Sequence, residues 1–306
     1  MKKYIVILLF FASTFIVNAQ QELMVSQYMF NGLLLNPAYA GTHEYFGASL
    51  LHRSQWVNFD EAPVTQVFGI DGPIFKNKMG VGLKITNDQL GVEKQTELGL
   101  NIAKHFQFNT GTLSFGLSGN LGMYSAEVND LTVWDDNDQL YTDNIVNEMV
   151  MKFGFGAYYH TDNWYLGLSV PTLFSQDDKV LPSGSSLSKF FTKHYYLNAG
   201  LVIKPNYNLA IKPSILVKME GEAPTELDLN CNFLLFKRFW LGAGYRTGDA
   251  LVGMLEYNIT PRFRAGYAYD FTTTDIKKYS AGSHEIMLGY DFGVVGVIKK
   301  RSPRYF

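Results

Sequence analysis

Residues 113–124 read LSFGLSGNLGMY, and this stretch decides the fold. Apart from Gly119, every second position from Leu113 to Met123 is a large apolar residue, and the positions between them are Ser, Gly or Asn. Because successive side chains of a β-strand point to opposite faces, one face of this strand is apolar and the other is polar or small. A strand of about ten residues with this alternation is typical of a transmembrane β-barrel, which has lipid outside and a polar interior.

The same alternation recurs along the chain. Residues 224–236 place Leu227, Leu229 and Phe233 on one face, and Asp228 and Asn230 on the other. Segments of this kind predict about fourteen strands, an even number as bacterial single-chain barrels require: 44–52, 63–71, 78–87, 94–105, 111–125, 150–159, 163–171, 193–204, 207–218, 224–236, 238–247, 250–259, 261–270 and 284–293.

Loop lengths distinguish a barrel from a soluble β-sandwich, which also alternates. The longest connections, 53–62, 126–149, 172–192 and 271–283, all follow odd-numbered strands, whereas connections after even-numbered strands are short. Outer-membrane barrels have this asymmetry, with long extracellular loops and short periplasmic turns. We therefore predict an all-β fold, a closed antiparallel transmembrane β-barrel in the outer membrane, with both termini in the periplasm.

The N-terminus predicts export. Lys2 and Lys3 precede an apolar run, and Ala19 ends a cleavage site, so residues 1–19 have the pattern of a signal peptide. The run is shorter than the ~20 residues of a spanning helix, which disfavours an N-terminal anchor. The predicted divisions are a signal peptide at 1–19, an N-terminal periplasmic or plug segment at 20–43, and the barrel at 44–306.

Segment 20–43 is apolar for a periplasmic tail. It contains six large apolar side chains that need burial, either inside the barrel mouth or against a partner, namely Met24, Tyr28, Met29, Leu33, Leu34 and Leu35. Whether the segment plugs the lumen is left open by the sequence.

Composition and motifs argue against several functions. Aromatic residues reach 15%, charged residues only 18%, and the net charge is −2, so no basic patch for nucleic acid is expected. No nucleophile elbow, P-loop or dinucleotide motif occurs, and the six histidines are most simply interface-facing, so we expect no enzyme and no cofactor. The acidic stretch in 126–149 could bind calcium or simply be a solvated loop.

The connection 53–62 contains Arg53, Gln55 and Trp56. Arg and Trp are enriched at binding hot spots, so these three residues are candidates for partner binding. The alternative is that they fold the loop over the barrel rim.

The chain also resembles the PorP/SprF family. The motifs that carry the resemblance are YMFN (28–31), NPAYAG (36–41), HRSQW (52–56), APVTQ (62–66), LSFGL (113–117) and SPRYF (302–306), with Gly32 where a proline is more usual. The resemblance implies an outer-membrane protein of the type IX secretion and gliding machinery. It adds Asn36, Pro37 and Tyr39 to the candidate partner-binding residues.

The leading hypothesis is therefore a non-enzymatic barrel that helps secrete or anchor a surface adhesin. The resemblance implies two protein partners, a secreted adhesin with a C-terminal sorting domain and periplasmic components of the secretion machinery. The alternative is a passive porin or hydrophobic-solute transporter, and an outer-membrane hydrolase is disfavoured. Charges predicted to face the lumen suit either an ion-paired plug or a polar pore: Lys84, Glu97, Lys152, Lys212, Glu226, Asp228, Glu256 and Arg264.

Overall fold

A computed structural model describes residues 24–127, 145–175, 193–220 and 224–292. The signal peptide, most of the acidic loop and the C-terminal SPRYF motif lie outside the described residues. Within the described ranges, no helix is long and apolar enough to cross a membrane.

Strands dominate the described chain. The strand segments are β1 (Phe46–Ser54), β2 (Val64–Ile74), β3 (Met79–Leu90), β4 (Glu93–Gln107), β5 (Thr112–Ala126), β6 (Ile145–His160), β7 (Trp164–Ser175), β8 (His194–Leu201), β9 (Ile203–Asn206), β10 (Leu209–Glu220), β11 (Glu226–Leu235), β12 (Phe239–Arg246), β13 (Ala250–Asn258), β14 (Phe263–Thr272) and β15 (Ser283–Phe292).

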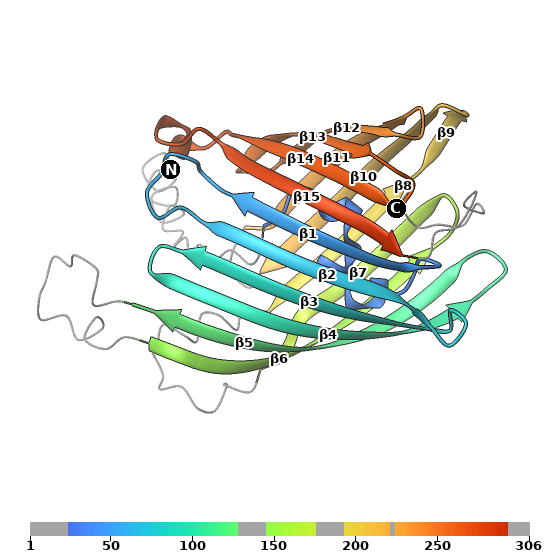
Figure 1. Ribbon diagram of the computed structural model, residues 1–306, viewed down its shortest axis with the longest axis horizontal. Helices are drawn as coiled ribbons and strands as arrows, with labels where there is room; N and C mark the ends of the chain where they lie inside the picture. The colour runs from blue at the N-terminus through green and yellow to red at the C-terminus, as the bar shows by residue number, and fades with distance from the viewer. Residues whose placement is uncertain (1–23, 128–144, 176–192, 221–223, 293–306) are drawn as a thin grey trace, which may run out of the picture.

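These segments form one closed antiparallel barrel (Figure 1). Each strand pairs with its neighbours in sequence, and β15 pairs with β1 to close the ring. β8 and β9 both pair with β10 and are parts of one strand interrupted at Val202, so the barrel has 14 strands. The predicted fold is confirmed, although β6 begins at Ile145 rather than at residue 150.

Side-chain exposure follows the alternation that predicted the fold. In β5, Phe115, Leu117 and Met123 are exposed on the outer face, whereas Ser118 and Asn120 are buried inside. An outer surface of large apolar side chains is stable only against lipid, because exposing so much apolar surface to water would cost a large free energy. The barrel therefore has the surface of a membrane-spanning protein.

The two ends of the barrel differ. At the short-turn end, strands are joined by connections such as 75–78, 108–111 and 236–238, and Phe75, Lys76 and Asn77 adopt the positive φ angles of a tight turn. At the long-loop end, the connections include 55–63 and 273–282. In Figure 1, β1 points toward the long-loop end on the left and β15 toward the short-turn end on the right.

The N-terminal segment (residues 24–43) lies inside the barrel, where Figure 1 shows it in dark blue. It forms three single turns of 3₁₀ helix, η1 (Tyr28–Phe30), η2 (Gly32–Leu34) and η3 (Pro37–Tyr39). Nearly all of its side chains are buried. The apolar side chains that needed burial thus find it in the chain's own lumen, because a barrel of this size encloses a space that must be filled or left open to water.

Candidate functional site in the barrel lumen

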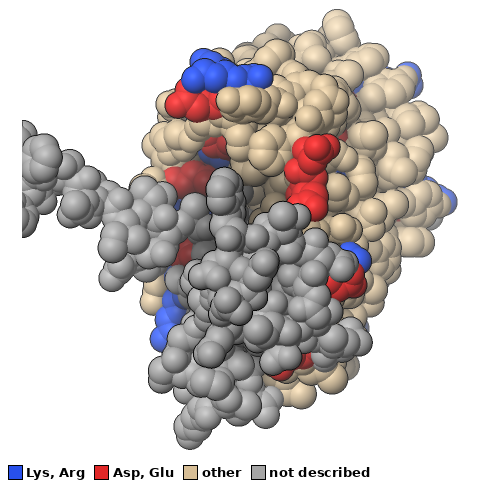
Figure 2. Space-filling view, turned by 90° about the vertical axis from the view of Figure 1, so that its left-hand side faces the viewer, with Lys and Arg blue, Asp and Glu red and all other residues tan. Residues whose placement is uncertain are grey.

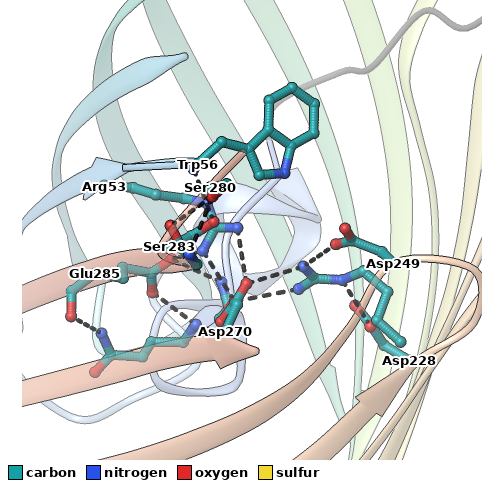
Figure 3. A network of polar contacts seen from close by, with 12 residues as sticks. Arg53, Trp56, Asp228, Asp249, Asp270, Ser280, Ser283 and Glu285 are labelled. Carbon is teal, nitrogen blue, oxygen red and sulfur yellow. Dashed lines mark hydrogen bonds and ion pairs between the residues drawn. The ribbon is translucent and has the colours of Figure 1, made fainter. Parts of the chain in front are cut away.

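A network of buried charges lies at the long-loop end of the lumen (Figure 3). It comprises Arg53 of β1, Arg246 of β12 and four acidic residues, and it is called the long-loop network here: Arg53, Arg246, Asp228, Asp249, Asp270 and Glu285. Both guanidinium groups are 1% exposed, so their charges are stable there only because carboxylates surround them.

Asp270 connects the two arginines. Its Oδ2 lies 2.8 Å from Nη2 of Arg53 and 3.3 Å from Nη1 of Arg246. Arg53 also approaches Glu285 at 3.4 Å, and Arg246 pairs with Asp228 at 2.9 Å. These pairs join β1, β11, β12, β14 and β15, which lie on one continuous arc of the barrel wall, so the network ties the first strand to the last ones.

The start of the N-terminal segment is the centre of this network. Ser26 Oγ lies 2.8 Å from the carboxylate of Asp270, to which it donates, and it accepts from Arg53 at 3.1 Å and Arg246 at 3.2 Å. The backbone N–H groups of Ser26 and Gln27 donate to the two carboxylate oxygens of Glu285 at 2.7 and 2.8 Å. Charge-assisted hydrogen bonds of this kind are the stronger ones in proteins, so the segment is firmly held at its first residues.

The middle of the segment is held by side chains of β10, β11 and β12. The ammonium of Lys212, buried in β10, donates to the carbonyl of Met29 at 3.0 Å. Asn230 of β11 donates to the hydroxyl of Tyr28 at 2.8 Å. The ring of Phe30 packs edge-on against Trp240 of β12, with centroids 5.6 Å apart. The segment thus provides hydrogen-bond partners for lumen-facing polar groups that would otherwise need water molecules as partners.

Asn36 anchors the NPAYAG motif. Its Nδ2 donates to the carbonyls of Ala157 and Leu168 at 3.0 and 3.1 Å, two residues that face each other on β6 and β7. Its Oδ1 accepts from Ala38 N at 2.9 Å, and Pro37 occupies the first position of η3. The motif is therefore a self-capped turn bound to the barrel wall, and these contacts account for the Asn and Pro.

Glycines in the wall make room for this turn. A Cβ atom on Gly116 of β5 would lie 2.2 Å from the backbone N of Ala38. On Gly156 of β6 it would lie 2.0 Å from Oδ1 of Asn36. Both glycines are at inward-facing positions, so the wall is flat where the segment contacts it.

Gly116→Ala is expected to destabilise the folded protein by about 1–3 kcal/mol, because the added methyl overlaps backbone that cannot move freely. Gly122→Ala is the matched control, since Gly122 faces inward on the same strand and a Cβ there would meet its nearest atom at 3.7 Å. The measurement is the temperature at which each folded barrel loses its fast migration in SDS gels. Equal shifts for both variants would contradict the packing of η3 on β5.

The segment leaves the lumen at the short-turn end. The N–H of Gly41, at a φ of 66°, donates to Oδ2 of Asp71 at 2.8 Å. Nε2 of His43 lies 3.4 Å from the other oxygen of Asp71. Burial lowers the pKa of His43 to about 4, which disfavours the charged imidazolium that an ion pair with Asp71 would need. A cavity of about 660 Å³ opens beyond His43 between the β4–β5 and β6–β7 turns.

Two further groups of lumen-facing charges are paired as well. Glu97 of β4 lies 3.6 Å from Lys84 and 3.3 Å from Lys152. Arg264 of β14 lies 2.8 Å from Asp291. Figure 2 looks onto the long-loop end, where charged side chains gather around the mouth while the barrel sides are largely uncharged. Charge is thus confined to the interior and rims, as the sequence predicted.

The six candidate partner-binding residues have contacts within the chain. Asn36, Pro37 and Tyr39 are buried in the lumen, and Gln55 is buried with its N–H bonded to the carbonyl of Pro63. Trp56 alone is partly exposed, at the long-loop rim with a φ of 47°. The placement of Arg53 in a loop was wrong, because Arg53 continues the inward-facing positions of β1 and pairs with Asp270.

Sequence reasoning missed most of the long-loop network. Arg246, Asp270 and Glu285 were not singled out, although each is a charge at an inward-facing position near a strand end, which was the available signal. Ser26 and Gln27 carried no signal at all. The simple interpretation of the histidines was also wrong for His105, which is buried and hydrogen-bonded to Ser114 at 2.6 Å.

Among the described residues, no group of three or more His, Cys, Asp or Glu side chains could hold a metal ion. The proposed calcium ligands in 128–144 lie outside the described residues.

A closed barrel with an apolar outer surface, charges confined to its interior and one end of long loops defines an outer-membrane β-barrel protein. The chain belongs to the PorP/SprF family, since it matches the family described as type IX secretion system membrane protein PorP/SprF over residues 17–290. The family resemblance drawn from the motifs is thereby confirmed.

Solved structures of outer-membrane barrels are similar in fold. The Acinetobacter baumannii outer membrane protein Omp33 matches with a TM-score of 0.50 at 10% identity, covering 82% of this chain and 100% of that one. The KdgM porin matches with a TM-score of 0.42 at 11% identity, covering 80% and 99%. No curated protein sequence matches this chain.

Proposed function

We propose that this protein is a non-enzymatic outer-membrane barrel of the type IX secretion machinery that helps secrete or anchor one particular surface adhesin, an adhesin with a C-terminal sorting domain. Family membership carries the proposal. In this arrangement the long-loop end faces the cell exterior, as is usual for outer-membrane barrels, and the short-turn end faces periplasmic components of the machinery.

The filled lumen supports a docking role over that of an open porin. The N-terminal segment occupies the interior with buried apolar contacts and with hydrogen bonds to buried carboxylates. Beside Phe30 and Asn31 the space left between segment and wall is about 40 Å³, which holds only a few water molecules. An ion or solute would have to displace the segment to pass there.

The long-loop rim offers a rigid surface for the adhesin. Connections 55–63 and 273–282 are joined by two backbone hydrogen bonds of 2.8 Å between Val57 and the pair Ala281 and Gly282. Phe59 is 44% exposed and Tyr279 is 68% exposed on these connections. Exposed aromatic side chains on an ordered base are the usual anchors of protein interfaces. We place the docking surface on this rim, with Trp56 at its inner edge.

Deleting the gene is expected to remove one large adhesin from the cell surface, which quantitative proteomics of surface-exposed proteins would measure. Complementation with the wild-type gene should restore the adhesin, and the double variant Phe59→Ala with Tyr279→Ala should restore it poorly. Phe75→Ala with Tyr207→Ala is the matched control, since Phe75 and Tyr207 are exposed at the opposite end. An unchanged surface proteome in the deletion strain would exclude the proposed function.

A further inference from the structure

The N-terminal segment has a direction through the lumen. Its first residues, Ser26 and Gln27, bond to Glu285 at the long-loop end. Its last residues, Gly41 and His43, bond to Asp71 at the short-turn end. The chain therefore runs from the long-loop mouth to the short-turn mouth before it enters β1.

The described ends of the chain consequently lie at opposite ends of the barrel. Met24 is at the long-loop end, whereas β15 finishes at Phe292 at the short-turn end. The expectation of both termini in the periplasm would need these two residues at the same end.

The residues that precede Met24 in the exported chain are too few to carry the N-terminus back to the short-turn end. Cleavage at the predicted site after Ala19 would leave four residues, 20–23, ahead of Met24. Four residues span about 14 Å at full extension. A strand of about ten residues, tilted by roughly 40°, crosses about 25 Å along the barrel axis. A chain of four residues cannot cross that distance.

We infer that the exported chain holds its N-terminus at the long-loop mouth, so that the free end opens on the same side of the membrane as the long loops. The long-loop network holds the start of the N-terminal segment in this position. Glu285 accepts both backbone N–H groups, and Ser26 lies between the guanidinium groups of Arg53 and Arg246. With the orientation proposed above, the N-terminus is part of the cell-surface face that a secreted partner meets.

This placement has a consequence for assembly. The segment lies within a closed ring of hydrogen-bonded strands, so its leading end has to pass through the ring or be enclosed when β15 pairs with β1. A peptide added directly after the signal peptide would therefore emerge beside the long loops. The inference concerns relative placement only and does not depend on the proposed partner.

Cysteine labelling in intact cells tests the inference. The Cys231→Ala background removes the chain's only native thiol, and single cysteines are then introduced at Gln21, at Lys277 in the 273–282 connection, and at Asp162 in a short turn. A membrane-impermeant maleimide should label the Gln21→Cys and Lys277→Cys variants in intact cells. It should label the Asp162→Cys variant only after permeabilisation. Heat-modified migration in SDS gels confirms that each variant folds.

The two control positions separate this inference from the orientation in the proposed function. If the Gln21→Cys variant labels only under the conditions that label the Asp162→Cys variant, the inference is overturned. If Lys277→Cys needs permeabilisation and Asp162→Cys does not, the proposed orientation fails. In that case, labelling of Gln21→Cys under the same conditions as Lys277→Cys would still support the inference, and labelling under different conditions would overturn it.

Discussion

Arg53→Met is expected to destabilise the folded barrel by roughly 3–5 kcal/mol, because removing one partner of a buried ion pair leaves an uncompensated buried charge. Arg53 is 1% exposed and is the cation nearest to Glu285 in the long-loop network, at 3.4 Å. Its loss also removes one of the two guanidinium groups that share Asp270. The measurement is the midpoint of urea unfolding in detergent micelles.

Lys278→Met is the matched control for this substitution. Lys278 also pairs with a carboxylate, that of Asp275 at 2.9 Å, but both side chains are largely exposed. Exposed pairs contribute little to stability, so the unfolding midpoint should hardly move. The unfolding midpoint of Arg53→Lys should lie between those of Arg53→Met and Lys278→Met, since lysine keeps the charge but lacks the planar fork of donors. Equal midpoints for Arg53→Met and Lys278→Met would show that the network does not stabilise the fold.

Removing the N-terminal segment is expected to convert a barrel with little conductance into a steady channel in planar bilayers. Replacing residues 24–43 with a Gly/Ser linker of the same length takes away the apolar and polar contacts that fill the lumen. The wall that remains carries polar groups and charges, such as Lys84, Glu97 and Lys152, that water can solvate. A barrel of fourteen strands is wide enough to conduct once it is empty.

The control for this experiment is a variant in which residues 274–280 are replaced by a Gly/Ser linker. These residues include the exposed turn η8 (Asp275–Lys278) at the rim, outside the lumen, so conductance should stay low. Both variants are checked for folding by their heat-modified migration. A wild-type protein that already conducts steadily would favour the porin alternative and would show that the segment does not seal the lumen.

The strands could be predicted because the alternation of apolar and polar residues that marks them is a local property of the sequence. In β5, for example, Phe115 and Leu117 face lipid while Ser114 and Ser118 face the lumen. Each of those preferences depends only on which phase surrounds the side chain. The sorting of loop lengths adds the distinction between the two ends. These two patterns need no knowledge of which distant residues touch.

The candidate site could be predicted only in part, for the opposite reason. Asn36 stood out through a family motif and Arg53 as a residue type enriched at binding hot spots. Their partners are Leu168 and Asp270, which are 132 and 217 residues away. Ser26 and Glu285 are separated by 259 residues. No spacing rule connects positions that far apart, so residues expected to bind another protein were found binding the barrel itself.

The sequence by itself determined that the chain is a membrane barrel, because the period of two that separates lipid-facing from lumen-facing residues is written along each strand. It also showed that residues 20–43 require burial. Only the tertiary structure decided where that burial occurs and in which direction the segment runs. Closure of the ring brings Glu285, Asp270 and Arg53 to one mouth and Asp71 to the other, and the hydrogen bonds available at each mouth settle which end of the segment lies there.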